Sequence, residues 1–214
     1  MNTEKTELVF ILDRSGSMGG LESDTIGGFN RMLARQKELD GTCRVTTILF
    51  DHVSLLLHDR LDLKAVDPLT EKDYQVRGST ALYDAVVFGI QKIQSVQDHS
   101  SPSERAGKVI FIIITDGMEN SSTCSGAKVR EMIQGAKANG WEFIFLGANI
   151  DAGEAAEEIG IGRERAQDYV PDGAGTAACY EATEMAISSI RQHGCLDQTW
   201  CEKLDQDFKT RGKK

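Results

Sequence analysis

Residues 8–18 of the sequence, LVFILDRSGSM, join an apolar run to three side chains that carry oxygen. Asp13, Ser15 and Ser17 occupy alternate positions, and Gly16 lets the backbone turn tightly between the two serines. One carboxylate and two hydroxyls, without nitrogen or sulfur, form a ligand set that suits a hard divalent cation. Asp, Ser and Gly are also ordinary turn-forming residues, so this stretch alone leaves a cation site and a simple turn equally open.

The apolar residues before Asp13 indicate the element that positions this motif. A short, continuous apolar run that ends in turn residues predicts a buried, central strand of a parallel sheet. Residues 109–115, VIFIIIT, show the same pattern and stop at Asp116 and Gly117. Open α/β sheets bind ligands beyond the carboxyl ends of their strands, so we expect Asp13 and Asp116 to lie at one edge of the sheet.

The remaining segments alternate between strand and helix patterns. Residues 43–50 predict a strand that turns back into an antiparallel partner at 53–57, and residues 141–147 and 166–170 predict two more strands. The alternation predicts an α/β fold. We expect a doubly wound, Rossmann-like open sheet of about six strands in the order 3-2-1-4-5-6, with one antiparallel edge strand and helices on both faces.

Apolar residues at helical spacing predict the helices between these strands. The longest is expected over residues 174–193, with an inward face made of Ala182, Met185, Ala186, Ser189 and Ile190. A short helix is expected up to residue 159, capped by Asp151. Residues 59–73 and 97–107 are polar and predict connecting loops.

The length favours one domain, which we place at residues 1–194, followed by a tail at residues 195–214. Trp200, Leu204 and Phe208 recur every four residues in this tail. That spacing predicts a short helix with one apolar stripe. We expect the stripe to pack on the domain itself, and docking onto a partner protein is the alternative.

Composition argues against several classes of function. The 24 Lys and Arg against 33 Asp and Glu give a net charge of −9, which argues against nucleic acid or an anionic membrane as the main partner. The sequence does not begin with a basic-then-apolar leader, and no apolar run approaches the roughly 20 residues of a membrane helix. The five cysteines form no C-x-x-C pair and predict free thiols. We therefore expect a cytoplasmic protein.

A third group of small polar residues, Gly-Ser-Thr at 78–80, ends a loop before a predicted helix. If the first and fourth strands are neighbours, this loop brings Thr80 beside Asp13 and Asp116. Two carboxylates in one crevice repel each other unless a cation, a proton or a basic side chain lies between them. Arg14 is close in sequence, but in an extended chain its side chain points away from Asp13. A divalent metal ion is the simplest solution.

The D-x-S-x-S motif, the later Thr and the later T-D-G resemble the metal-ion-dependent adhesion site of von Willebrand factor A domains. The resemblance extends over residues 8–193 and includes the order of strands and helices. All five motif positions match, namely Asp13, Ser15, Ser17, Thr80 and Asp116. More narrowly, the chain resembles small stand-alone bacterial A-domain proteins of the cytoplasm, including those linked to tellurite resistance.

The resemblance implies a metal and a mode of binding. Ser15, Ser17 and usually Thr80 would contact the ion, and Asp13 and Asp116 would act directly or through water. Mg²⁺, Mn²⁺ and Ca²⁺ all suit oxygen ligands. Neutral hydroxyl ligands leave the ion with much of its charge, so that it recruits an Asp or Glu of a partner protein. We therefore expect a non-catalytic, metal-dependent protein-binding module whose partner the sequence does not identify.

Two alternatives belong to other classes. A Mg²⁺-dependent phosphatase or phosphotransferase of the haloacid-dehalogenase type also places an Asp at the end of its first strand. It needs a second Asp two residues later, where this chain has Ser15, and a Lys near the site, whereas Lys108 precedes its strand. A nucleotide-binding Rossmann protein would carry G-x-G-x-x-G or G-x-x-x-x-G-K-[ST], and neither motif occurs.

Overall fold

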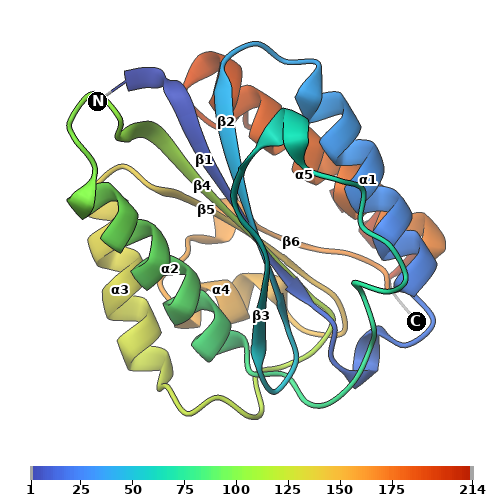
Figure 1. Cartoon of the computed structure of the whole chain (residues 1–214). Helices are drawn as coiled ribbons and strands as arrows, with labels where there is room; N and C mark the ends of the chain where they lie inside the picture. Colours follow the sequence, from blue (N-terminus) through green and yellow to red (C-terminus); the bar gives the residue numbers. More distant parts are fainter. Residues whose placement is uncertain (1, 213–214) are drawn as a thin grey trace.

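The structure, a computed structural model, describes residues 2–212, with side chains from Lys5 onward. Within these residues six strands form one sheet that lies between two layers of helices (Figure 1). The strands are β1 (Asn2–Asp13), β2 (Thr42–Phe50), β3 (Ser54–Asp62), β4 (Ala106–Thr115), β5 (Glu142–Gly147) and β6 (Ala166–Asp168). Their order across the sheet is β3-β2-β1-β4-β5-β6.

Neighbouring strands run parallel except β2 and β3, which form an antiparallel hairpin at one edge. β1 lies between β2 and β4, with Asp13 beside Phe50 of β2 and Leu12 beside Ile114 of β4. The carboxyl ends of these three strands therefore finish at the same edge of the sheet. The predicted fold class, strand order and antiparallel edge strand are confirmed.

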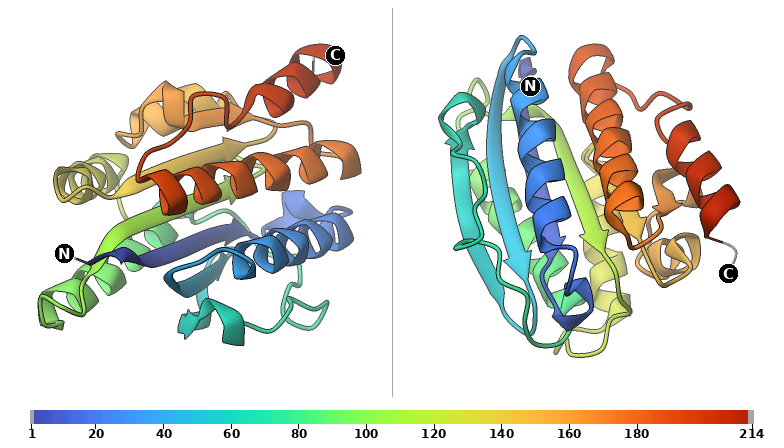
Figure 2. Two further views of the ribbon diagram at one scale, coloured as in Figure 1. Left: turned by 90° about the horizontal axis from the view of Figure 1, so that it is seen from above. Right: turned by 90° about the vertical axis from the view of Figure 1, so that its right-hand side faces the viewer.

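Helices cover both faces of the sheet. In the described chain they are α1 (Glu22–Lys37), α2 (Leu82–His99), α3 (Gly126–Ala138), α4 (Ala152–Glu158), α5 (Gly173–His193) and α6 (Glu202–Arg211). α1, α5 and α6 lie in that order across one face (right-hand view of Figure 2), and α2, α3 and α4 pack on the other. β1 supplies both cores through alternate residues, Leu8 and Phe10 on one side and Val9 and Ile11 on the other.

Two strands are longer than their apolar runs predict. β1 begins at Asn2 because its polar first half pairs with both neighbouring strands, for example Glu7 with Val109 of β4. Glu7 is buried there and forms an ion pair with Arg60 of β3. β3 continues to Asp62, past the predicted end at residue 57, because it keeps pairing with β2 as far as Arg44. A polar segment can therefore form a strand that its sequence does not predict, when neighbouring strands supply its backbone hydrogen bonds and pair its charged side chains.

Two predictions about helices are wrong. α2 runs to His99 and β4 begins at Ala106, so the expected loop at 97–107 shrinks to residues 100–105. Met185 was expected to face the core but is 40% exposed. The buried stripe of α5 passes through Thr183 and Ile187 instead, which leaves Met185 on the outer side of the helix.

The tail forms α6 after a turn that starts at the left-handed Gly194. Trp200 and Leu204 are buried in the same cluster as α1 and α5, and Phe208 is half-buried. An ion pair of 2.6 Å between Arg211 and Asp172 joins the end of α6 to the start of α5. All five cysteines are free. None of the helices in residues 2–212 is long and apolar enough to span a membrane.

Candidate metal centre

The candidate site lies where β1 and β4 end. Asp13 is the last residue of β1, and a 3-10 turn at Gly16–Met18 brings Ser17 back over the strand ends. Ser17 Oγ donates to Asp116 Oδ1 at 2.5 Å, and Ser15 Oγ lies 3.1 Å from Ser17 Oγ. Asp116 therefore lies next to the three residues of the D-x-S-x-S motif, although it follows them by about a hundred residues in the sequence.

Thr80 reaches the same point from the loop before α2. A Cβ added to Gly117 would stand 3.2 Å from Ser17 Oγ and 3.6 Å from Thr80 Oγ1, so both hydroxyls flank Gly117. The backbone of Thr80 is fixed by Asn120, whose side chain accepts from Thr80 N at 2.9 Å and whose N–H donates to Thr80 O at 3.1 Å. The structure thus brings all five residues that the sequence predicts to one edge of the sheet.

Asp13 is held rigidly in this cluster. Its Oδ1 accepts from Ser15 N at 2.7 Å and its Oδ2 accepts from Thr115 Oγ1 at 2.6 Å. Its backbone carbonyl accepts a hydrogen bond from the hydroxyl of Tyr74. Asp13 and Thr115 are at most 1% exposed. Thr115 and Tyr74 orient the carboxylate and were not predicted in this role.

The charges of the cluster are not balanced by the protein. Burial is the main reason that the pKa of Asp116 rises to about 6; the hydrogen bond from Ser17 opposes the rise and the charge of Asp13 adds to it. Burial also raises the pKa of Asp13, although the hydrogen bond from Thr115 opposes it. Asp116 Oδ2 is buried and has no hydrogen-bond partner among the described residues. A buried, unpartnered carboxylate oxygen beside a second carboxylate is an arrangement that a cation would complete.

Arg14 does not neutralise this pair of acids. Its guanidinium lies 3.0 Å from Asp51, as its position between Asp13 and Ser15 suggests. The part of the chain that the structure describes holds no group of three or more His, Cys, Asp or Glu that could bind a metal. A cation at this edge would therefore depend on hydroxyl ligands together with the two carboxylates, which is the ligand set of a hard ion.

A second cluster, centred on the buried Asp51, supports the loops that carry the site. Asp51 follows β2, and its Oδ2 lies 3.0 Å from Arg14 Nε and 2.9 Å from Arg77 Nε. Its backbone carbonyl accepts from Ala81 N at 2.8 Å, and Arg77 N donates to Arg14 O at 2.9 Å. Gly78, at φ 69°, makes the turn between Arg77 and Thr80. The cluster ties the D-x-S-x-S loop to the loop of Thr80.

The loop after Asp116 folds back onto the start of α2. Glu119 accepts from the backbone N–H groups of Tyr83 at 2.9 Å and Ser122 at 2.7 Å. Asp84 accepts from the N–H groups of Thr123 and Cys124, both at 2.9 Å. These carboxylates accept from backbone N–H groups of the loop and of α2, and so fix the loop that carries Gly117. Asp151, as predicted, caps α4 by accepting from Glu154 N at 2.7 Å.

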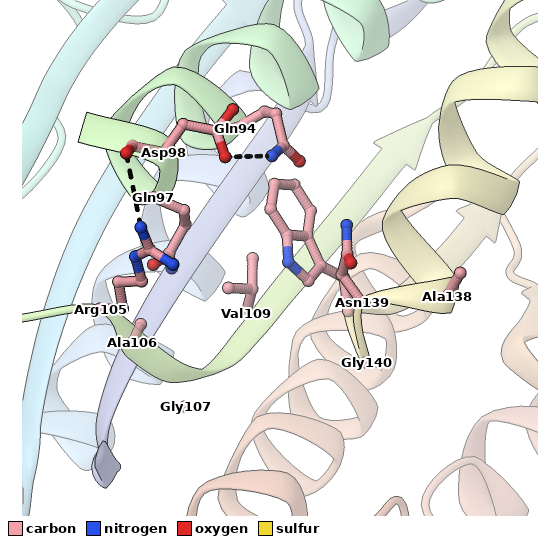
Figure 3. A pocket seen from close by; sticks show the side chains of 11 residues that line it. Gln94, Gln97, Asp98, Arg105, Ala106, Gly107, Val109, Ala138, Asn139 and Gly140 are labelled. Atoms are coloured by element: carbon pink, nitrogen blue, oxygen red, sulfur yellow. Dashed lines mark hydrogen bonds between the residues drawn. The ribbon is translucent and has the colours of Figure 1, made fainter. Parts of the chain in front are cut away.

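A hollow of about 410 Å³ lies at the opposite edge of the sheet, between the ends of α2 and α3 and the start of β4 (Figure 3). Its polar side chains bond to the protein itself: Gln94 donates to Asp98 at 2.8 Å, and Arg105 donates to Ser100 O at 3.0 Å. None of the five predicted site residues lines it. This hollow therefore does not belong to the candidate metal site.

A family model of the von Willebrand factor type A domain matches residues 7–174, which is most of the chain and includes all five site positions. The chain belongs to the von Willebrand factor type A family. None of the curated proteins compared with this A domain matches it.

Solved structures agree on the fold. The A domain superposes with a TM-score of 0.60 on a D319A mutant of the PilB minor pilin from Streptococcus sanguinis, at 13% identity over 92% of this chain and 62% of the pilin. It superposes equally well, at 0.60 and 13% identity, on the vWF domain of the pilus tip protein Mfa5 from Porphyromonas gingivalis, over 90% and 98% of the two chains. Manganese-loaded TRAP protein from Plasmodium vivax gives 0.56 at 18% identity, over 82% and 72%.

Proposed function

We propose that this A domain is a non-catalytic protein-binding module. Asp13, Ser15, Ser17, Thr80 and Asp116 would hold a divalent cation, Mg²⁺ or else Mn²⁺ or Ca²⁺, and an Asp or Glu of a partner protein would complete the shell. The observation that carries the proposal is the buried Asp116 Oδ2, which has no hydrogen-bond partner among the described residues and lies beside Asp13 and three hydroxyl residues. The manganese carried by the TRAP protein supports the choice of ion class.

The carboxylates and the hydroxyls of the site would have different roles. A bound cation supplies positive charge that attracts a partner carboxylate. Asp13 and Asp116 are each 1% exposed and would hold the ion on its buried side, while Ser17 is exposed and would lie on the side open to a partner. Neutral hydroxyls from Ser15, Ser17 and Thr80 do not cancel the charge that a partner would sense. The resulting bond would be made only when metal and partner acid are both present.

The phosphatase alternative lacks the groups it needs. Ser15 stands where a haloacid-dehalogenase enzyme requires its second Asp. Lys108 lies near the start of β4, at the other end of the strand from Asp116, and donates to the carbonyl of Arg191. A cytoplasmic location and a kinship with bacterial proteins linked to tellurite resistance remain predictions from the resemblance.

Calorimetric titration of the metal-free protein tests the proposed site. We expect Mg²⁺ and Mn²⁺ to bind wild-type protein at one site, and Asp13→Ala to abolish binding. Asp98→Ala removes an exposed carboxylate at the opposite edge of the sheet and should leave binding unchanged. Equal metal affinity in Asp13→Ala and wild type would contradict the site. A protein partner that stays bound in excess chelator would contradict recruitment through the metal.

A further inference from the structure

A second hollow, of about 430 Å³, opens beside the candidate metal site. It lies between the first turn of α2, the loop after Asp116, and α4. Gly117 belongs both to its lining and to the metal site, because a Cβ on Gly117 would stand 3.2 Å from Ser17 Oγ. An extended peptide advances about 3.3 to 3.6 Å per residue, so a chain whose acid reaches the metal enters this hollow within three residues.

Part of the lining of the hollow is apolar. Met118 is 74% exposed, more than any other large apolar side chain among the described residues, and it directly follows Gly117. Tyr83 and Ile150 are half-buried and line the rest of this surface. An aromatic ring and a flexible thioether together suit the long alkyl stem of a partner side chain.

The outer rim of the hollow is acidic. The carboxylate of Glu119 already accepts hydrogen bonds from backbone N–H groups. Asp151 caps α4 and lies 3.7 Å from Arg163. Glu154 and Glu158 are exposed on α4 and form no ion pair in the described structure. A Cβ added to Gly126 would stand 3.4 Å from Tyr83 Oη and 3.5 Å from Glu158 Oε1, so the carboxylate and the phenol lie near each other. Burial raises the pKa of Tyr83 to about 12, and the charge of Glu158 and its hydrogen bond with Tyr83 add to the rise. Two exposed carboxylates without an ion pair, next to apolar side chains, suit a side chain with an alkyl stem and a cationic end.

The overall charge of the protein points the same way. At a net charge of −9, the domain repels a partner segment that offers only the carboxylate for the metal. A basic residue next to that carboxylate removes the repulsion and is steered toward the acidic rim.

We propose that the partner segment carries a Lys or Arg within three residues of its metal-binding Asp or Glu. Its stem lies on Met118 and Tyr83, and its charged end lies between Glu154 and Glu158. This inference rests on the proposed metal-dependent function and specifies the chemistry of the partner. The domain would then recognise two residues of one segment, an acidic residue at the metal and a basic residue in the hollow.

Selection from displayed random seven-residue peptides tests this inference. Immobilised protein in Mg²⁺ is washed and then eluted with chelator, so that only metal-dependent binders are sequenced. We expect an acidic residue in nearly all eluted peptides, and Lys or Arg at least fivefold above library frequency within three positions of it. With Glu154→Lys/Glu158→Lys, the acidic residue should persist and the basic enrichment should disappear.

Glu71→Lys/Glu181→Lys is the matched control, because it makes the same change in charge at exposed positions outside the hollow that also form no ion pair in the described structure. This control should keep the basic enrichment. Acidic peptides without basic enrichment in wild type, or enrichment that survives Glu154→Lys/Glu158→Lys, would overturn the inference and leave the proposed function standing. An eluate without acidic peptides would overturn both.

Discussion

Asp51 and Asp116 are two buried aspartates at the same edge of the sheet, with opposite surroundings. Each directly follows a strand, β2 or β4, and each is at most 1% exposed. Burial alone would raise the pKa of Asp51, but the hydrogen bond from Arg77 and the charge of Arg14 hold it below its ordinary value. Asp116 has Asp13 and hydroxyl groups around it, and its pKa rises to about 6.

The difference separates a structural cluster from a binding site. Asp51 accepts a hydrogen bond from Arg77 at 2.9 Å and forms an ion pair with Arg14 at 3.0 Å, so its charge is balanced within the protein. Its Oδ1 also lies 3.0 Å from His52 Nδ1. Asp116 keeps one buried oxygen without a partner among the described residues. Position at the carboxyl edge is common to both aspartates, so it does not by itself make a site. An unbalanced buried charge is what calls for a ligand.

Replacing Asp51 should give the largest loss of stability. Asp51→Asn keeps the shape of the side chain but leaves Arg14, whose side chain is 5% exposed, without a counter-charge. Removing one partner of a buried ion pair lowers the free energy of unfolding by about 3 kcal/mol or more. We expect urea unfolding of the metal-free protein to show a decrease of this order in the free energy of unfolding.

Asp59→Asn provides the control for this experiment. Asp59 is 56% exposed and pairs with Lys92 on the surface, where such a pair contributes less than about 1 kcal/mol. If Asp51→Asn were no more destabilising than Asp59→Asn, the Asp51 cluster would not support the site loops.

The contribution of Asp116 to stability should depend on pH in the opposite direction to that of Asp51. Its raised pKa means that folded, metal-free protein holds the proton more tightly than the unfolded chain does, so this group's stabilisation is complete below about pH 4 and is lost as pH rises through about 6. The lowered pKa of Asp51 acts in the other direction, because its stabilisation is present above the ordinary value of 3.8 and is lost only as pH falls below it.

Thermal unfolding in chelator between pH 4.5 and 8 measures this effect. Relative to Asp116→Asn, wild-type protein should lose stability across this range, and saturating Mg²⁺ should restore it above pH 6. Parallel pH profiles of the two proteins in chelator would show that Asp116 ionises normally and would remove the contrast with Asp51.

Sequence patterns predict the sheet, its strand order and the five candidate site residues. They do not predict the side-chain contacts that support these residues. Apolar runs reveal the buried strands β1 and β4, and polar residues directly after them fall at one edge for topological reasons. The Asp51 cluster joins residues that lie in three separate loops and have no characteristic spacing. Likewise, burial of the polar start of β1 depends on an ion pair between Glu7 and Arg60, which only the hairpin of β2 and β3 brings together.

Thr115 should show the smallest effect on stability and a clear effect on the metal. Its hydroxyl donates to Asp13 Oδ2 at 2.6 Å and, together with Ser15 N, orients this carboxylate. The same hydrogen bond lowers the pKa of Asp13 against the effect of burial. Thr115→Val keeps the shape and removes the donor. We expect a loss of about 1 to 2 kcal/mol in stability, since a hydrogen bond to a charged group is lost.

Metal affinity should fall by about tenfold in Thr115→Val, equivalent to about 1.4 kcal/mol, because a less ionised and less fixed Asp13 binds the ion more weakly. Thr115→Ser retains the hydroxyl and should recover most of the affinity, which separates the hydrogen bond from simple packing. The contrast with Asp51 then becomes quantitative. Asp51→Asn removes a counter-charge outside the metal site, and the greater part of its effect should appear as lost stability. Thr115→Val acts on the carboxylate that would face the metal, so calorimetric titration should detect a fall in affinity together with a smaller loss of stability than in Asp51→Asn.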